Sequence, residues 1–189
     1  MDNTHGMGAA DSFGPQVVKR PGVVANANVK GRWEVVCRDK HGNIKWTDVI
    51  ENLVTNVGLN HLLDVTLSAA TQVTSWYVGL TDGTPTVDAG DTAASHDGWT
   101  EVTAYDEATR VAWSDGGVSN QSVSNSGSPA EFTISTNSTT VGGAFLISNS
   151  TKGGSTGTLY AVGAFSAGDK ILDDGDTLAV TATFTAAAA

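Results

Sequence analysis

The sequence predicts a mainly β protein, an antiparallel β-sandwich or jelly-roll-like body with one short helix and an extended N-terminal arm. Many short apolar stretches lie between clusters of Gly, Ser, Asn and Asp, which favour turns, and about eight such stretches are typical of a sandwich or jelly roll. Helical spacing is found in a single stretch, and the first residues follow neither strand nor helix periodicity. We therefore divide the chain into an arm, residues 1–30, and a β-rich body, residues 31–189.

The arm region and the body carry opposite charge. Residues 1–45 hold seven bases and four acids, a net charge of +3, whereas the other 144 residues hold three bases and sixteen acids, a net charge of −13. Residues 1–30 also contain four glycines and two prolines, so we expect an arm that is disordered alone and becomes ordered on a partner. The acidic body disfavours nucleic acid as a partner, because proteins that bind it usually present a basic surface.

Two further features concern the cell compartment. No apolar run approaches the roughly 20 residues of a membrane helix, and the N-terminus lacks a basic-then-apolar signal segment, so we expect neither a membrane partner nor secretion by that route. Cys37 is the only cysteine, which excludes an intrachain disulfide and is typical of synthesis in a reducing cytoplasm.

The first element of the body is predicted to be a β-hairpin. Residues 32–39 alternate enough for a strand, residues 40–43 (Lys-His-Gly-Asn) form a turn signal, and residues 44–50 run back. Trp33 and Trp46 lie on the two strands, where they can form a cross-strand aromatic pair.

The helix is predicted over residues 52–68. Thr55 or Asn56 can cap it. Gly58 disfavours a helix here. The residues at helical spacing are Leu59, Leu62, Leu63 and Thr66.

The rest of the chain is predicted as strands and loops. Residues 81–98 form a long loop with four aspartates, and loops of this length are usually functional or packed by their own side chains. The predicted strands are residues 76–80, 109–113, 130–135, 141–148, 158–165 and 177–184.

No motif indicates catalysis or a cofactor. The nucleophile-elbow, P-loop and dinucleotide-binding patterns are absent, and the four histidines show no zinc-ligand spacing. Cys37 and His41 only span the hairpin turn, so we interpret Cys37 as a semi-buried strand residue. Glu101, Asp106 and Glu107 are acids without further signs of a glycosidase pair, and we interpret them as surface residues. We expect no enzyme, no cofactor and no metal.

Two binding alternatives remain open at this stage. Calcium prefers clustered oxygen ligands, as in residues 173–176 (Asp-Asp-Gly-Asp) and in the aspartates at 82, 88, 91 and 97, although Asp and Gly also favour plain turns. Trp76, Tyr77 and Trp99 can stack on a sugar or pack in the core, and Trp76 and Tyr77 point to opposite faces of their strand, so at most one of these two serves a ligand.

One stretch resembles a known class of proteins. Leu53-Val-Thr-Asn-Val-Gly-Leu-Asn-His-Leu-Leu63 is followed by Trp76-Tyr-Val-Gly-Leu80, by Asp91-Thr-Ala-Ala-Ser-His-Asp-Gly-Trp-Thr-Glu101, and then by Tyr105 and Arg110-Val-Ala-Trp113. This series, about a third of the chain, resembles virion structural proteins of tailed bacteriophages, most of all the small proteins that cement or decorate the capsid. The resemblance implies a non-enzymatic protein made in the host cytoplasm and placed on the capsid exterior, where it staples adjacent capsomers.

The resemblance also implies partners, namely the major capsid protein and further copies of this chain as a dimer or trimer on the shell. An extended arm can add a strand to a neighbouring sheet edge while its apolar residues fill pockets. We expect His96 and Trp99 to form a self-association loop. The residues expected to bind the capsid are Phe13, Val17, Val18, Lys19, Arg20, Val23 and Val24 of the arm, with Trp33 and Trp46 of the hairpin.

Three other functions are compatible with the sequence. A tail, collar or fibre-base adaptor would be present in about a dozen copies per particle instead of hundreds. A carbohydrate-binding adhesin would need an exposed aromatic platform near Trp76 or Trp99, and it gives the basic arm no role. A polysaccharide depolymerase would need an acid/base pair, and we find none.

Overall fold

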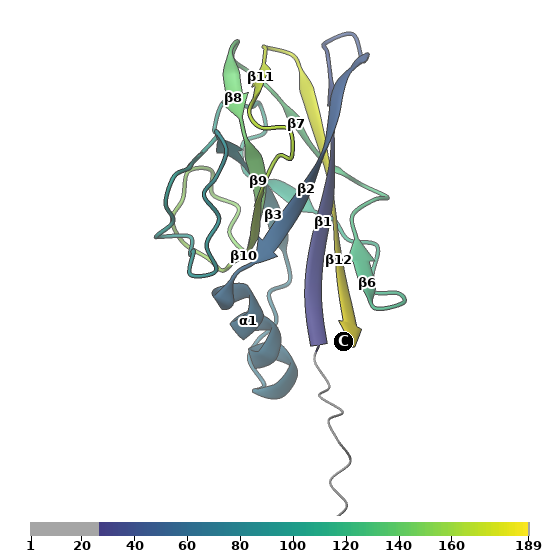
Figure 1. The fold of residues 1–189 in the computed structure, drawn as a ribbon, viewed down its shortest axis with the longest axis vertical. Helices are drawn as coiled ribbons and strands as arrows, with labels where there is room; N and C mark the ends of the chain where they lie inside the picture. The colour runs from purple at the N-terminus through teal and green to yellow at the C-terminus, as the bar shows by residue number, and fades with distance from the viewer. Residues whose placement is uncertain (1–26, 189) are drawn as a thin grey trace, which may run out of the picture.

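A computed structural model describes residues 27–188, and Figure 1 shows them as a β-rich body with a single helix at one end. The predicted fold class, mainly β and antiparallel with one short helix, is confirmed. No helix in this part of the chain has the length and apolar character needed to cross a membrane. The elements are β1 (Ala27–Arg38), β2 (Ile44–Val54), α1 (Asn56–Leu67), β3 (Trp76–Asp82), β4 (Thr100–Glu101), β5 (Val111–Trp113), β6 (Ser122–Ser124), β7 (Ala130–Thr133), β8 (Thr139–Val141), β9 (Gly143–Ile147), β10 (Leu159–Ala164), β11 (Lys170–Leu172) and β12 (Thr177–Ala188).

Most strands belong to one antiparallel sheet with the order β4-β3-β9-β10-β2-β1-β12-β6. Two further strands of this sheet lie off that path, since β5 pairs with β3 and β7 pairs with β12. Strands β11 and β8 form a small second sheet. Strand β2 joins the two halves of the large sheet, because it pairs with β1 along most of its length and with β10 at Leu53 and Val54. The inner faces of the two halves meet across a common core. Tyr160 of β10, for example, packs edge-to-face on Phe184 of β12, with 5.3 Å between the ring centres.

The predicted hairpin is confirmed as β1 and β2, joined at residues 39–43. The Asp39 carboxylate closes this turn by accepting hydrogen bonds from the backbone N–H groups of His41 (2.8 Å) and Asn43 (2.9 Å), and Gly42 takes a positive φ of 85°. Strand β1 is longer than predicted. It begins at Ala27, so residues 27–30 belong to the sheet and not to the arm.

The predicted pairing of Trp33 with Trp46 is wrong. The turn fixes a register in which Trp33 lies opposite Ile50, and Trp46 lies opposite Cys37. The two tryptophans share a face but are separated by four positions along the hairpin, about 13 Å. Each finds another partner across the core, since Trp33 packs on Phe184 (6.3 Å between ring centres) and Trp46 on Phe165 (5.6 Å).

The helix begins four residues later than predicted, because residues 52–54 continue β2. Thr55 is its N-cap: the hydroxyl accepts a hydrogen bond from Gly58 N (3.1 Å) and donates one to the carbonyl of Leu159. Gly58 lies against β10, and a Cβ at this position would be 2.5 Å from the carbonyl oxygen of Tyr160. The glycine that disfavours a helix by propensity therefore lets α1 approach the sheet.

The long predicted loop is packed by its own side chains. Residues 83–99 cross the outer face of β3, β9 and β10, where Ala93 and Trp99 join Phe145 and Leu159 in a second apolar cluster. Half of the large sheet is therefore buried on both faces. Four short strands, β4, β6, β8 and β11, were not predicted, since each has only two or three residues.

Candidate functional site

The two ends of the body are built from different elements (Figure 1). The helix end consists of α1, the first residues of β1, the last residues of β12, and β6. The opposite end, the turn end, consists of the loops 39–43, 165–170 and 173–176. Because β1 begins at the helix end, the N-terminal residues that precede Ala27 join the body there.

The first candidate surface at the helix end is a fork between β1 and β2. The two strands pair from Arg38 down to the pair Gly31 and Asn52, and then separate. Residues 27–30 pair with β12 alone, while the end of β2 turns away to β10. A groove of about 420 Å³ opens between them. Within residues 27–188, no strand pairs with the β1 edge that faces this groove.

Asn52 at the base of the fork has unsatisfied hydrogen-bonding capacity. Its side chain covers Gly31, and a Cβ on that glycine would lie 2.0 Å from Asn52 Oδ1. Both polar atoms of the Asn52 amide are buried and have no hydrogen-bond partner in the described part of the chain. A buried polar group without a partner is costly, so the base of the fork is not optimised for stability within the described residues.

One face of α1 extends this surface with exposed leucines. Leu59, Leu63 and Leu67 follow one another at four-residue spacing and are 38%, 55% and 79% exposed. The helix turns another face inward, with His61, Leu62 and Val65, toward the body. The leucines found at helical spacing are therefore divided between two faces of α1, with Leu59 and Leu63 on the exposed face and Leu62 on the inward face. We call the fork and these three leucines the fork surface.

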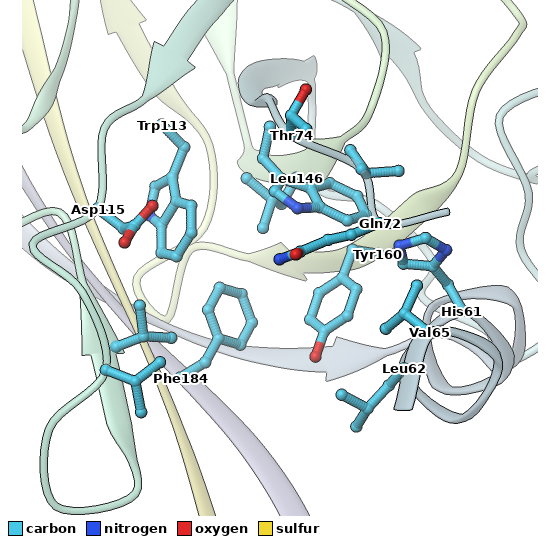
Figure 2. Close-up of a pocket in the computed structure, with 14 residues that line it drawn as sticks. His61, Leu62, Val65, Gln72, Thr74, Trp113, Asp115, Leu146, Tyr160 and Phe184 are labelled. Atoms are coloured by element: carbon cyan, nitrogen blue, oxygen red, sulfur yellow. The ribbon is translucent and has the colours of Figure 1, made fainter. Parts of the chain in front are cut away.

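The second candidate surface is a cleft of about 500 Å³ between the inner face of α1 and the sheet (Figure 2). Trp76 of β3 and Trp113 of β5 are directly opposite in the register, so both indoles lie on the same face of the sheet. Tyr160 packs on Trp76 (5.4 Å between ring centres) and on Phe184, which in turn packs on Trp113 (6.0 Å). We call this the aromatic cleft.

Polar side chains surround the aromatic cleft without being used by the fold. Among residues 27–188, His61, Gln72, Thr74 and the Tyr160 hydroxyl make no side-chain hydrogen bond, and burial raises the pKa of Tyr160. Asp115 accepts one hydrogen bond, from Gly117 N, through a single carboxylate oxygen. In Figure 2 the Tyr160 hydroxyl points between Phe184 and Leu62, and the Asp115 carboxylate lies beside Trp113.

The capsid-binding residues expected from the sequence are only partly within the structure. Those of the arm, from Phe13 to Val24, lie outside the described residues. Trp33 is 0% exposed, so its side chain is a core residue in this fold and has no surface to offer a partner. Trp46 is half-buried against Phe165, away from the fork surface.

The expected self-association residues lie on the long outer loop. His96 stacks on Trp99 with 3.6 Å between ring centres, and Trp99 is 7% exposed because it packs on Phe145. Trp99 therefore packs over the second apolar cluster. Its indole offers neither a contact surface for another copy nor a platform for a sugar. Only His96 is open to a neighbour.

Two of the three acids considered for catalysis hold loops in place. Glu101 forms a buried bidentate pair with Arg110 (2.8 and 2.7 Å), and the remaining donors of Arg110 reach the carbonyls of Asn149 and Gly154. Glu107 accepts a hydrogen bond from Thr133 N (3.1 Å). Asp106 is exposed, as predicted.

The remaining candidates also have structural roles. Cys37 is fully buried, where the prediction had it semi-buried, and burial raises the pKa of its thiol to about 11, so the reactive thiolate is disfavoured. Asp176 binds Lys45 and accepts from Asp173 N (2.8 Å), and Asp88 accepts from Gly90 N (2.6 Å). No group of three or more His, Cys, Asp or Glu side chains suited to a metal ion occurs between residues 27 and 188.

No protein-family model matches this chain, and a comparison with curated proteins finds no match. The functional argument therefore depends on the geometry of the helix end. Sequence reasoning missed the fork surface, because the separation of β1 from β2 depends on the pairing of β2 with β10, more than 100 residues away along the chain. It identified Trp76 but not its partner Trp113.

Proposed function

We propose that this chain is a non-enzymatic structural protein of a tailed-phage virion that binds the outer capsid surface and staples adjacent capsomers. The partner is the major capsid protein. The fork surface, at the end of the body where the arm begins, is the observation that carries the proposal. The resemblance of residues 53–113 to virion proteins and the opposite charges of the arm region and the body support the same function.

The fork offers a partner an open strand edge. An extended segment that enters the groove can pair with the free edge of residues 27–30. Main-chain hydrogen bonds of this kind give affinity, while side-chain pockets on either side give specificity. The groove is short, so strand addition alone makes a small contact.

The leucines of α1 provide the apolar part of the contact. Full burial of a leucine side chain contributes about 1.5–3 kcal/mol, and Leu63 and Leu67 have most of that area still exposed. Ordering the arm costs free energy, so binding is favourable only where the fork, the leucines and the arm meet their partners together. Junctions between capsomers provide such sites, and copies of this chain around a junction can associate symmetrically.

A binding experiment with purified particles tests this proposal. Particles stripped of the protein are incubated with the full chain, with a variant that lacks residues 1–26, and with the double variant Leu63→Ser/Leu67→Ser, and bound protein is measured after sedimentation. We expect the deletion to abolish binding and the double variant to weaken it by more than tenfold.

The matched control is the double variant Ile44→Ser/Ile171→Ser. These two side chains are each 57% exposed, similar to Leu63, but both lie at the turn end. Binding that survives in the leucine variant, or that falls equally in the control, contradicts the proposal. Full occupancy at about a dozen copies per particle would place the protein at a collar or tail instead.

A further inference from the structure

We propose that the aromatic cleft is a binding site for a neutral saccharide. This inference does not depend on the capsid role, because the cleft lies on the inner side of α1 and the fork surface on its other side. The cleft volume of about 500 Å³ is within the range of small-molecule sites, about 300–1,000 Å³.

The walls of the cleft suit the apolar face of a sugar ring. Trp76 and Trp113 are cross-strand neighbours, yet their rings pack on different aromatics, Trp76 on His61 and Tyr160, and Trp113 on Phe184. The Trp113 ring is held in place by a hydrogen bond from Nε1 to the carbonyl of Ala182 (3.3 Å). Side chains fixed in this way bind a ligand with little loss of conformational entropy.

The polar groups of the cleft match hydroxyl groups. An amide (Gln72), an imidazole (His61), two hydroxyls (Thr74 and Tyr160) and one free carboxylate oxygen (Asp115) make no hydrogen bond to other residues between 27 and 188. Together they offer both donors and acceptors, which is what a ring of hydroxyl groups requires. Three of these groups, Gln72, Thr74 and Asp115, form the exposed rim, while His61 and Tyr160 lie half-buried deeper in the cleft.

The charge of the cleft excludes anionic ligands. No lysine or arginine lines it, its single carboxylate is Asp115, and the body as a whole is acidic. Phosphates, nucleotides and acidic sugars would meet no opposite charge. Gln72, Thr74 and Asp115 are exposed, so a soluble ligand can reach the cleft without a change in the fold.

The five tryptophans provide a direct test. The indole N–H signals of the ¹⁵N-labelled full chain are followed by NMR during titration with neutral sugars, namely glucose, galactose, mannose, rhamnose, N-acetylglucosamine, maltose, lactose and chitobiose, up to tens of millimolar. Sialyllactose and choline serve as anionic and cationic probes. We expect at least one neutral sugar to shift the signals of Trp76 and Trp113 saturably, and those of Trp33, Trp46 and Trp99 to stay in place.

Variants at the exposed rim separate binding from folding. Gln72→Ala and Asp115→Ala are expected to weaken binding of that sugar by about fivefold or more, the effect of one lost hydrogen bond. Asp97→Ala, at an exposed aspartate on the outer loop, is the matched control and should have no effect. The inference is overturned if no neutral sugar shifts the two signals, if only sialyllactose or choline does so, or if both rim variants bind as the unaltered chain does.

Discussion

The helix end and the turn end differ in how their polar and apolar side chains are used. At the turn end, Asp39 closes one loop, Asp48 holds the loop 165–170, and Asp176 joins Lys45 to the loop 173–176. At the helix end, the Asn52 amide and most polar groups of the aromatic cleft have no hydrogen-bond partner among residues 27–188, and Leu59, Leu63 and Leu67 of α1 face solvent.

This difference separates stability from binding. Side chains whose hydrogen bonds are satisfied within the chain contribute to the free energy of folding, and their loss should be visible in unfolding experiments. Side chains left open contribute little to folding and are available to a partner. The account predicts that substitutions of the exposed side chains at the helix end change binding without changing stability, and that the opposite holds for the core, the cap of α1 and the turn end.

The largest effect is expected in the core between the two ends. Trp33→Ala should lower the free energy of unfolding by about 5 kcal/mol, the upper end for large aromatic residues, because Trp33 is fully buried and packs on Phe184. Urea denaturation monitored by circular dichroism measures this. A loss below about 1 kcal/mol would contradict the assignment of Trp33 to the core.

The buried pair of Glu101 and Arg110 should give the next largest effect. Glu101→Gln leaves the guanidinium buried without its counter-charge, and we expect a loss of about 3 kcal/mol, the lower end for such pairs, because Gln retains the shape of the side chain. The control is Glu34→Gln, which removes the exposed pair with Arg32. Equal melting temperatures for the two variants would contradict the structural role of the buried pair.

Asp48 connects the stability of the turn end to pH. Burial raises the pKa of Asp48, but hydrogen bonds from Ser166, Val49 and Ala167, together with the charge of Lys170, outweigh burial and hold the pKa below its ordinary value. Since the pKa is lower in the folded protein, the stabilisation is present above about pH 3.9 and is lost as the pH falls through the folded value.

The variant Asp48→Asn tests this dependence. It should lose about 2 kcal/mol at neutral pH, as for hydrogen bonds to a charged group, and the difference from the unaltered chain should shrink in strong acid. Melting temperatures measured across this pH range give the result, and the exposed Asp106→Asn is the control. A difference in melting temperature that does not depend on pH would show that the charge of Asp48 does not contribute to stability.

A smaller effect is expected at the cap of α1. Thr55→Ala removes the acceptor for Gly58 N and should cost about 1 kcal/mol, while Thr55→Ser keeps the hydroxyl and should cost less. Thermal unfolding followed in the far ultraviolet measures both variants. If the Ser and Ala variants unfold at the same temperature, the hydroxyl of residue 55 does not determine where α1 begins.

The smallest effect on stability should come from the fork surface itself. Leu63→Ser/Leu67→Ser should change the free energy of unfolding by less than about 1 kcal/mol, since both side chains are already exposed, although particle binding is weakened. Urea denaturation of this variant measures the change. A large loss of stability would show that the leucines serve the fold, and the contrast between the two ends would disappear.

The sequence predicted the parts of the fold that depend on local patterns. The hairpin and its turn were found, and the cap was narrowed to Thr55 or Asn56, because alternation, Gly42 and capping side chains act within a few residues. The start of α1 was misplaced because β2 continues to Val54 through pairing with β10, which no local pattern shows. The same distant pairing creates the fork, so the fork could not be predicted either.

The candidate sites were predicted less well than the fold. Trp33 and Trp99 were considered for surface roles, and both are buried, because a large aromatic gives the same local signal in a core as on a surface. Trp76 was recognised as a possible platform, but Trp113, Tyr160 and Phe184 reach the same cleft from separate strands. Such convergence requires the sheet order, which composition and spacing do not contain.

The central claim is tested most directly by cryo-electron microscopy of purified particles with icosahedral averaging. The account predicts ordered density for this chain at every capsomer junction, with α1 and the start of β1 toward the shell and the turn end toward solvent. Density with the turn end against the shell, or density confined to a portal vertex or tail, would contradict it.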